Sequence, residues 1–454
     1  MNLKVIVAGG GPAGAAVAMS LAQQGHTATL YEAYPPPLQV EKNSPKAYVI
    51  SLGKRGQDGL EAATGITPES VQNGILSLDF VRQTVKKPAL QKRSFASLVV
   101  PRKVLAAHVL ERAREYGVKI HYEHRVVDIE FDKRQVILDN KGKQVKDTYD
   151  LLIGADGSNS KVRAIMNERL DDFSVLREEQ DTMEYQVVTL PETPFQQWPA
   201  DTVYSWNNKK YNAISLGYPL ASGEFLFAIV FPRGKFKEFK VSQKETGNGY
   251  DDALASLFAN LDVATQKELA AQLYKGEPAN GGLCVWVSAL GSIRQGVCLV
   301  GDSGSAMWPS LGQGANCSLE SAAVFCQSFK DVVAASSITA SPTEIANHIV
   351  QEFNDRRHQD VTAAVDLTFG GIGAKTSRGS QNAPLSYKMQ IVGMMFLNRI
   401  TAGLIPKPAL FRLMLGEDIA YSTAHKFHFG YEKLICLSAV AFVSVPFVTM
   451  WFLR

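Results

Sequence analysis

The sequence predicts an α/β protein in which a Rossmann-like domain is split along the chain by a β-sheet domain, followed by a helical region and one transmembrane helix. Near the N-terminus, an apolar strand over residues 4–8 runs directly into a glycine-rich turn and a helix over 15–24. From about residue 179 to 286 the chain is rich in short β-type segments, and near Gly296 the earlier strand-and-glycine pattern returns. An alternation that is interrupted and then resumed indicates one domain inserted into another.

The composition sets bounds on the function. The chain has 454 residues, 46% hydrophobic and 20% charged, which is typical of an ordered protein of two or three domains. A formal net charge of +3 is too small to favour nucleic acid as a partner, and none is expected. The five cysteines show no C-x-x-C spacing. They predict neither a metal site nor a disulfide framework, but buried reduced thiols.

The first strand ends in a glycine-rich turn that opens directly into a helix. Its residues are Gly9, Gly10, Gly11, Pro12, Ala13 and Gly14. Glycine permits the tight turn and lets backbone N–H groups approach a pyrophosphate at the positive end of the helix. Glu32 ends the next strand, where a carboxylate can accept hydrogen bonds from a ribose 2′-hydroxyl. The pattern predicts a site for FAD or NAD rather than for a 2′-phosphorylated nucleotide; an ordinary tight turn is the alternative.

Two later strands each deliver an aspartate at their C-terminal ends. Asp156 follows the strand at 151–153, and Asp302 follows the strand at 297–300. Open α/β sheets bind ligands at this edge, where Asp302 can accept hydrogen bonds from ribityl hydroxyls. The loop after Asp302 begins a helix whose free N–H groups favour negative charge; it contains Pro309, Gly312, Gly314, Ala315 and Asn316. Each segment alone is also compatible with a plain strand–turn–helix joint.

In this order, the three motifs resemble the dinucleotide fingerprint, the "DG" motif and the "GD" motif of the flavoprotein aromatic hydroxylases, the p-hydroxybenzoate hydroxylase class. Within that class the chain is most similar to the kynurenine 3-monooxygenases along nearly its whole length. The matching stretches are residues 51–56, 183–185, 312–314 and 366–367, together with a hydrophobic C-terminal tail. The resemblance implies FAD contacts at the motif residues, which are Gly9, Gly11, Pro12, Ala13, Gly14, Glu32, Asp156, Asp302, Pro309, Gly312, Gly314, Ala315 and Asn316, and also at Ser51 and Arg102.

The sequence departs from the kynurenine 3-monooxygenases at the substrate carboxylate. Those enzymes bind it with an arginine, an asparagine and a tyrosine, and an ungapped match places Phe80, Gly371 and Phe411 at these positions. Losing all three contacts would leave a carboxylate desolvated, which costs several kcal/mol. Arg82, two residues from Phe80 on the same strand parity, could restore one contact. A less polar aromatic or lipophilic substrate fits Phe80 and Phe411 better than kynurenine does.

The resemblance implies an enzyme, an FAD-dependent monooxygenase that uses NAD(P)H and O₂ to hydroxylate an aromatic or lipophilic small molecule. The chain has one dinucleotide fingerprint, so NAD(P)H is expected to bind transiently as co-substrate. No catalytic acid or base can be assigned from the sequence. Two alternatives stay open: a flavin-dependent reductase or dehydrogenase of the same fold, similar to the prenyl reductases, and a non-catalytic membrane-tethered nucleotide-binding protein.

The predicted domains alternate along the chain. They are FAD-binding segments at 1–75, 98–178 and 287–340, substrate-domain segments at 76–97 and 179–286, a helical region at 341–431 and an anchor at 434–453.

The anchor is predicted from its length and composition. Residues 434–453 are 20 residues without a charge, and the rise of a helix makes such a run about 30 Å long, the thickness of a bilayer's hydrocarbon core. Lys433 and Arg454 bracket the run, and Trp451 suits an interface. We therefore expect a single-pass C-terminal membrane anchor, in the mitochondrial outer membrane if the source is eukaryotic, as the resemblance implies. A buried core helix is the alternative.

Overall fold

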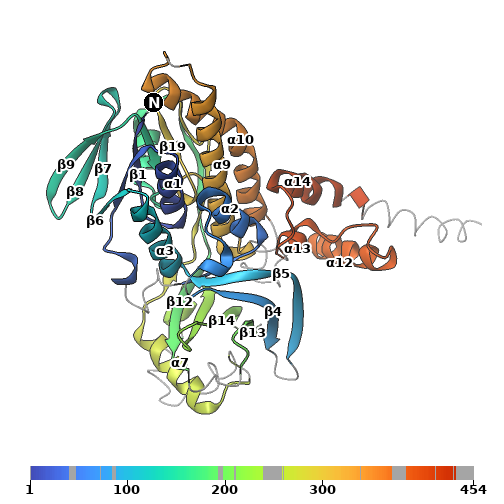
Figure 1. The fold of residues 1–454 in the computed structure, drawn as a ribbon. Coiled ribbons are helices and arrows are strands. Elements are labelled where there is room, and N and C mark those ends of the chain that lie inside the picture. The colour runs from blue at the N-terminus through green and yellow to red at the C-terminus, as the bar shows by residue number, and fades with distance from the viewer. Residues whose placement is uncertain are drawn as a thin grey trace, which may run out of the picture.

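The structure is a computed structural model. It describes residues 2–39, 48–71, 73–83, 88–192, 198–208, 211–238, 258, 260–337, 339–370, 385–414, 416–432 and 434–435. Within these residues the chain forms four β-sheets, with helices packed on and between them (Figure 1).

The first sheet has six strands and is parallel except at one edge. Its order is β18 (Gly291–Ser292), β19 (Val297–Leu299), β10 (Leu151–Gly154), β1 (Lys4–Ala8), β2 (Thr27–Glu32) and β6 (Lys119–Tyr122). β1 lies between β10 and β2, with Val7 opposite Ile153 and Leu30. β1, β10 and β19 are apolar runs because the centre of a parallel sheet is covered on both faces. The sheet therefore brings together stretches that lie far apart in the sequence.

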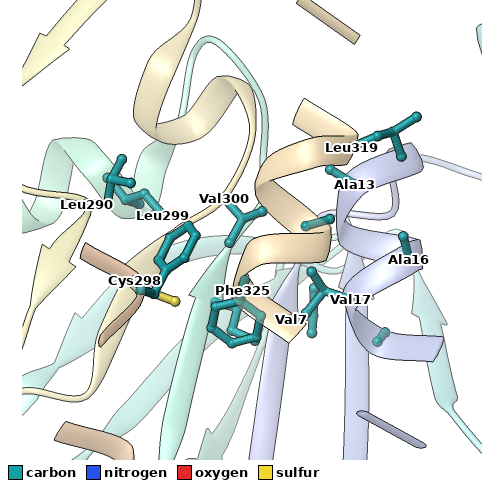
Figure 2. Packing of buried hydrophobic residues seen from close by; sticks show 14 of the residues in the cluster. Val7, Ala13, Ala16, Val17, Leu290, Cys298, Leu299, Val300, Leu319 and Phe325 are labelled. Carbon is teal, nitrogen blue, oxygen red and sulfur yellow. The ribbon is translucent and has the colours of Figure 1, made fainter. Parts of the chain in front are cut away.

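Helices bury this sheet from both sides. They are α1 (Pro12–Gln23), α2 (Lys54–Thr64), α3 (Arg102–Glu115), α4 (Lys161–Arg169), α8 (Asp302–Ser305), α9 (Gly314–Ala335) and α10 (Pro342–Gly370). Figure 2 shows Phe325 of α9 close to Val7 of β1 and Val17 of α1. All three side chains are fully buried. This hydrophobic core holds the ends of β1, β10 and β19 at one edge.

The second sheet has eight strands. Its order is β16 (Ala279–Asn280), β12 (Met183–Leu190), β15 (Phe225–Pro232), β14 (Ala213–Pro219), β13 (Thr202–Asn208), β4 (Ile75–Gln83), β5 (Ala89–Pro101) and β3 (Val49–Leu52). One face packs under α7 (Val263–Lys275) through Trp206, Phe227 and Phe258. The other face carries a separate apolar cluster with Val203 and Tyr218. β3, which the sequence grouped with residues 1–75, forms the far edge of this sheet.

Smaller elements complete the described structure. A three-stranded sheet of β7 (Arg125–Glu130), β8 (Gln135–Asn140) and β9 (Lys143–Thr148) extends from the first sheet, and β11 (Val175–Gln180) pairs with β17 (Leu283–Val287). Short 3₁₀ turns are η1 (Pro37–Gln39), η2 (Pro68–Ser70), η3 (Phe131–Lys133) and η5 (Pro309–Leu311). α14 (Tyr421–Lys426) lies beside α10 (Figure 1). Farther from α10 lie α13 (Ala409–Met414), α12 (Leu385–Ile400) and the π-helical turn η6 (Phe427–Tyr431). The four described cysteines are unpaired and buried.

The predicted transmembrane helix, and the single-pass membrane location that depended on it, are contradicted. Among the described residues, no helix combines the length and the apolar composition that a membrane crossing requires. A crossing takes about 20 predominantly apolar residues. The apolar-rich α12 has only 16 residues, and the 22-residue α9 carries Glu320, Lys330 and Asp331. Of the predicted span at 434–453, residues 436–453 lie outside the described residues.

The core around Phe325 gives a stability prediction. Phe325 is fully buried and its ring packs against Phe353 at a centroid distance of 5.4 Å. Phe325→Ala should lower the free energy of unfolding by about 3–5 kcal/mol because it removes a buried ring and leaves a cavity. Urea denaturation followed by circular dichroism measures this. The control Val263→Ala, at a position that is 64% exposed, should change stability by less than about 0.5 kcal/mol. Similar losses in both variants would contradict the assigned core.

Candidate flavin site

The glycine turn between β1 and α1 is a backbone cradle without room for side chains. Gly9 has φ +114°, and a Cβ there would lie 2.3 Å from the carbonyl oxygen of Ala155. A Cβ at Gly14 would lie 2.2 Å from the carbonyl oxygen of Gly9. Among the described residues, no side chain caps the start of α1, whose first position is Pro12. The free N–H groups and the helix dipole at this end fit a pyrophosphate.

Glu32 is fixed beside this cradle. Its Oε2 accepts a hydrogen bond from the backbone N–H of Gly10 at 2.6 Å, and its Oε1 accepts one from Tyr34 at 2.9 Å. Each carboxylate oxygen has a second lone pair. The geometry therefore leaves acceptor capacity for a ribose hydroxyl next to the pyrophosphate cradle.

Arg102 connects the cradle to the second sheet. It is the first residue of α3, directly after β5, and its backbone N–H donates to the carbonyl oxygen of Tyr48 at 3.0 Å. Its Nη2 lies 3.0 Å from where a Cβ on Gly11 would be. The guanidinium carbon is 5.9 Å from the centre of the Tyr48 ring. A cation is thus held at the mouth of the glycine turn.

Asp302 lies in the same cluster. Burial raises the pKa of its carboxyl group, and the positive charge of Arg102 opposes that rise. Its Oδ1 accepts a hydrogen bond from Ser318 Oγ at 3.1 Å. Gly301, with φ +68°, packs between α1 and α9, since a Cβ there would lie 3.4 Å from the Cβ of Ala13. The structure therefore brings the third motif to the start of α1.

The loop at 309–316 is held from β3. Asn316 is buried, and its Nδ2 donates to the carbonyl oxygens of Gly312 at 2.9 Å and Ser51 at 3.3 Å. Its Oδ1 accepts from the backbone N–H of Gly53 at 2.9 Å. The Asn316 side chain therefore braces the start of α9. At Gly314 a Cβ would meet only Met307 Cγ, at 3.9 Å, so there is space next to the backbone near Pro309 and Ala315.

Asp156 makes its hydrogen bonds inside its own loop. It accepts from Ser160 Oγ at 2.5 Å and from the backbone N–H of Lys161 at 2.7 Å, at the start of α4. Burial raises the pKa of this carboxyl group. In the same motif, Arg163 donates to the carbonyl oxygen of Ser303 at 2.9 Å. The second motif therefore contacts the third through Arg163. Asp156 stabilises its own loop, and its hydrogen bonds within the described structure are not made to the glycine turn.

Phe80 lies on the face of the eight-stranded sheet that carries Val203 and Tyr218. It packs against that cluster together with Tyr185 and Tyr48. Burial, and to a smaller extent the electrostatic effect of the neighbouring Tyr48, raises the pKa of Tyr185 to about 12. The positive charge of Arg102 opposes this rise. This aromatic face therefore adjoins the Arg102 cluster.

The other predicted substrate residues are placed differently. Arg82 pairs with Ser205 in the strand register. Phe411 is half-buried in α13, which contacts η5. Gly371 lies outside the described residues.

Three residues of this arrangement were missed by the sequence: Tyr48, Tyr185 and Ser318. Tyr185 stands in a stretch that carried the resemblance, at 183–185, but a stretch alone does not indicate a role. Tyr48 meets Arg102 only because β3 pairs with β5, and Ser318 meets Asp302 only because α9 returns over the sheet. No local pattern signals such contacts.

Comparisons with known proteins agree with this geometry. Residues 2–215 match the family model described as an FAD binding domain. The kynurenine 3-monooxygenase of Stenotrophomonas maltophilia is 27% identical over 69% of this chain and 69% of its own length. The violacein synthase of Chromobacterium violaceum is 26% identical over 71% of this chain and 77% of its own.

Solved structures share the fold. The tetrameric 2-methyl-3-hydroxypyridine-5-carboxylic acid oxygenase superposes with a TM-score of 0.62 and 20% identity, covering 85% of this chain and 93% of its own. Pseudomonas aeruginosa PqsL, in complex with 2-aminobenzoylacetate, gives a TM-score of 0.60 at 20% identity, covering 83% and 96%. The chain is an FAD-dependent monooxygenase, and it is similar to the flavoprotein aromatic hydroxylases. FAD is the cofactor of this monooxygenase, and the cradle, Glu32 and Asp302 fit it.

A first test of the monooxygenase site adds a side chain to the cradle. Gly11→Val should abolish most FAD binding because its Cβ lies against Arg102 and its methyl groups exclude the pyrophosphate. The measurement is flavin absorbance per mole of purified protein. The control Gly430→Ala, where a Cβ meets nothing within 4 Å, should keep wild-type flavin content. A Gly11→Val protein with wild-type flavin content would contradict the assignment of the glycine turn as the FAD-binding cradle.

A second test uses pH. Because the pKa of Asp302 is raised in the fold, the native state binds this proton more tightly than the unfolded chain, so stability falls as pH rises through the raised pKa. Asp302→Asn has no proton to lose. The apoprotein of this variant should therefore gain thermal stability over wild type at pH 8 and gain less at pH 5, while its affinity for FAD drops. A gain that is larger at pH 5 would contradict the buried-carboxyl account.

Proposed function

We propose that this monooxygenase uses NAD(P)H and O₂ to hydroxylate an aromatic or lipophilic small molecule that lacks a charged group at the Phe80 position. The observation that carries the proposal is the aromatic face of the eight-stranded sheet. Phe80, Tyr185 and Tyr218 gather there on an apolar cluster next to Arg102 and Tyr48. Such a surface favours an aromatic ring and disfavours a carboxylate without a cationic partner.

Different residues of the chain are proposed to bind different parts of FAD. We propose contacts at the cradle for the pyrophosphate, at Glu32 for the ribose and at Asp302 for the ribityl chain. Asp156 and Asn316 act through the loops they brace. Bound FAD supplies the redox and oxygen chemistry, and the protein supplies orientation and a dry site. The start of α9 offers backbone N–H groups where negative charge develops.

The proposed contacts come from the first and third motifs, from Ser51 in β3 and from Arg102 directly after β5. They are Gly9, Gly11, Pro12, Ala13, Gly14, Glu32, Ser51, Arg102, Asp302, Pro309, Gly312, Gly314 and Ala315.

Tyr185 is the polar group of the proposed substrate site. Its raised pKa keeps the phenol protonated at neutral pH, so it is a hydrogen-bond donor and not a base. Its neighbours Tyr48 and Phe80 are largely apolar surface that excludes water. Because the sequence holds a single dinucleotide fingerprint, NAD(P)H is proposed to bind transiently.

Kynurenine is the natural first compound to test, since several relatives carry its name. We predict that uncharged aromatic compounds support NAD(P)H oxidation at a kcat/KM about 100-fold higher than kynurenine does, because a desolvated carboxylate without a partner costs several kcal/mol. The measurements are oxygen uptake and product mass with ¹⁸O₂. Efficient 3-hydroxylation of kynurenine would contradict the proposal. Substrate reduction without ¹⁸O incorporation would favour the reductase alternative.

A variant pair tests the proposed face. Phe80→Ala should change KM and substrate preference, because Phe80 packs on the cluster beside Tyr185. The control Val81→Ala alters the opposite face, where Val81 packs with the cluster under α7. If both variants changed substrate preference equally, the effect would come from disturbed folding of the sheet and not from loss of a substrate contact at Phe80.

A further inference from the structure

The side chain of Gln313 joins the loop at 309–316 to the C-terminal helices. Its Oε1 accepts a hydrogen bond from the hydroxyl of Tyr421 at 2.9 Å. Its Nε2 donates to the carbonyl oxygens of Leu413 at 3.3 Å and Leu311 at 3.2 Å. Two of these three partners belong to α13 and α14, which follow Gln313 by about a hundred residues in the sequence.

Tyr421 is itself held rigidly. It is only 1% exposed, and the guanidinium carbon of Arg55 lies 4.2 Å from the centre of its ring. Burial raises the pKa of Tyr421 well above its ordinary value, so the hydroxyl keeps its proton and donates a hydrogen bond to Gln313 Oε1. Arg55 also donates to the carbonyl oxygen of Ile419, just before α14. The donor is therefore fixed both by packing and by the neighbouring backbone.

Buried ion pairs tie α14 to the helices on the first sheet. Glu320 of α9 pairs with Arg55 of α2 and, at 2.6 Å, with Arg357 of α10. Arg357 also pairs with Asp360 at 3.0 Å, and Asp360 accepts from the backbone N–H of Ser422 at 2.8 Å. Removing one partner of a buried pair leaves an uncompensated charge, so this network resists local displacement.

The loop needs such a support. Gly312 adopts a left-handed conformation with φ +64°, and a Cβ placed there would meet nothing within 4 Å. A left-handed glycine without neighbours on that side has many accessible backbone states. Within the described structure, side-chain bonds restrain the loop on three sides. They come from Asn316 on the β3 side, from Gln313 on the α13–α14 side, and from Ser310, whose Oγ donates to the carbonyl oxygen of Thr368 in α10 at 3.5 Å.

We propose that Tyr421 is a positioning residue that sets the conformation of the loop at 309–316 through Gln313. The inference rests on the proposed function in one respect, the placement of this loop beside the flavin. Helix α13 contacts η5 and carries Phe411. A displacement of α13–α14 is therefore transmitted to the flavin loop through Gln313, which couples the C-terminal helices to the geometry at the cofactor.

The test compares two hydroxyl deletions. Tyr421→Phe removes the donor and keeps the ring under Arg55. Tyr149→Phe is the matched control, because Tyr149 is 3% exposed and its hydroxyl has no hydrogen-bond partner within the described structure. Hydrogen exchange of the peptide at 309–317, in apoprotein and in holoprotein, should accelerate about tenfold in Tyr421→Phe and stay unchanged in Tyr149→Phe, as expected for loss of one neutral hydrogen bond.

A second readout concerns catalysis. In Tyr421→Phe the fraction of NAD(P)H oxidation that ends as H₂O₂ should rise several-fold, and FAD should bind about fivefold more weakly. Gln313→Met removes the same bond from the other side. It should reproduce the faster exchange, and adding Tyr421→Phe to it should produce little further change.

The outcomes separate the two ideas. Equal exchange at 309–317 in Tyr421→Phe and Tyr149→Phe overturns the positioning role, as does full additivity in the double variant. If exchange responds as expected but no hydroxylated product forms in wild type with any aromatic compound, the positioning role stands and the proposed function fails. If Tyr421→Phe does not fold, Gln313→Met alone decides by the same exchange measurement.

Discussion

The rest of the site depends on one close backbone contact, between the turn after β1 and the end of β10. A Cβ at Gly9 would lie 2.3 Å from Ala155, and a Cβ at Gly14 would lie 2.2 Å from Gly9, so only glycine permits the approach. The contact seats α1 against the parallel sheet with its N-terminal end free. Glu32, Arg102 and Asp302 are positioned around that end because β2, β5 and β19 are packed relative to it. Any widening of the turn would move all three charges.

Charge burial is the second constraint. Asp302 and Asp156 both have raised pKa values because of burial, which is unfavourable for folding at neutral pH. Asp156 is compensated by hydrogen bonds at the start of α4. Within the described structure, Asp302 accepts a side-chain hydrogen bond from Ser318 and is offset by the positive charges of Arg102 and Arg163. The fold therefore keeps the Asp302 carboxylate buried, with few hydrogen bonds to offset its desolvation, at the edge where the flavin is proposed to bind. Such a group is more easily explained by ligand contact than by stability.

In the proposed arrangement, the first sheet contacts the cofactor and the second sheet contacts the substrate. The first sheet contributes strand ends and helix starts, which present backbone N–H groups and carboxylates. The second contributes a face of aromatic and aliphatic side chains, with Tyr185 as a protonated phenol. Arg102 and Tyr48 lie where the sheets meet, since β3 and β5 belong to the second sheet and lead directly into the helices of the first. The arrangement places an apolar sheet face next to the polar residues of the proposed flavin site.

The sequence by itself determined the features that local physics controls. Alternating strands, the glycine turn with Glu32 and the two strand-end aspartates each follow from residues close together in the chain, and they predict a dinucleotide-binding α/β fold. The flavin monooxygenase class was predicted from the resemblance of the three motifs, in their order, to a known family. The apolar run at 434–453 shows the limit of composition: it predicted a membrane helix, and the described structure contains none. Only the tertiary structure decided the capping role of Asp156, the Arg102–Tyr48–Asp302 cluster and the Gln313–Tyr421 bond. These contacts join residues up to two hundred positions apart, because sheet order and helix packing, which no short window encodes, bring them together.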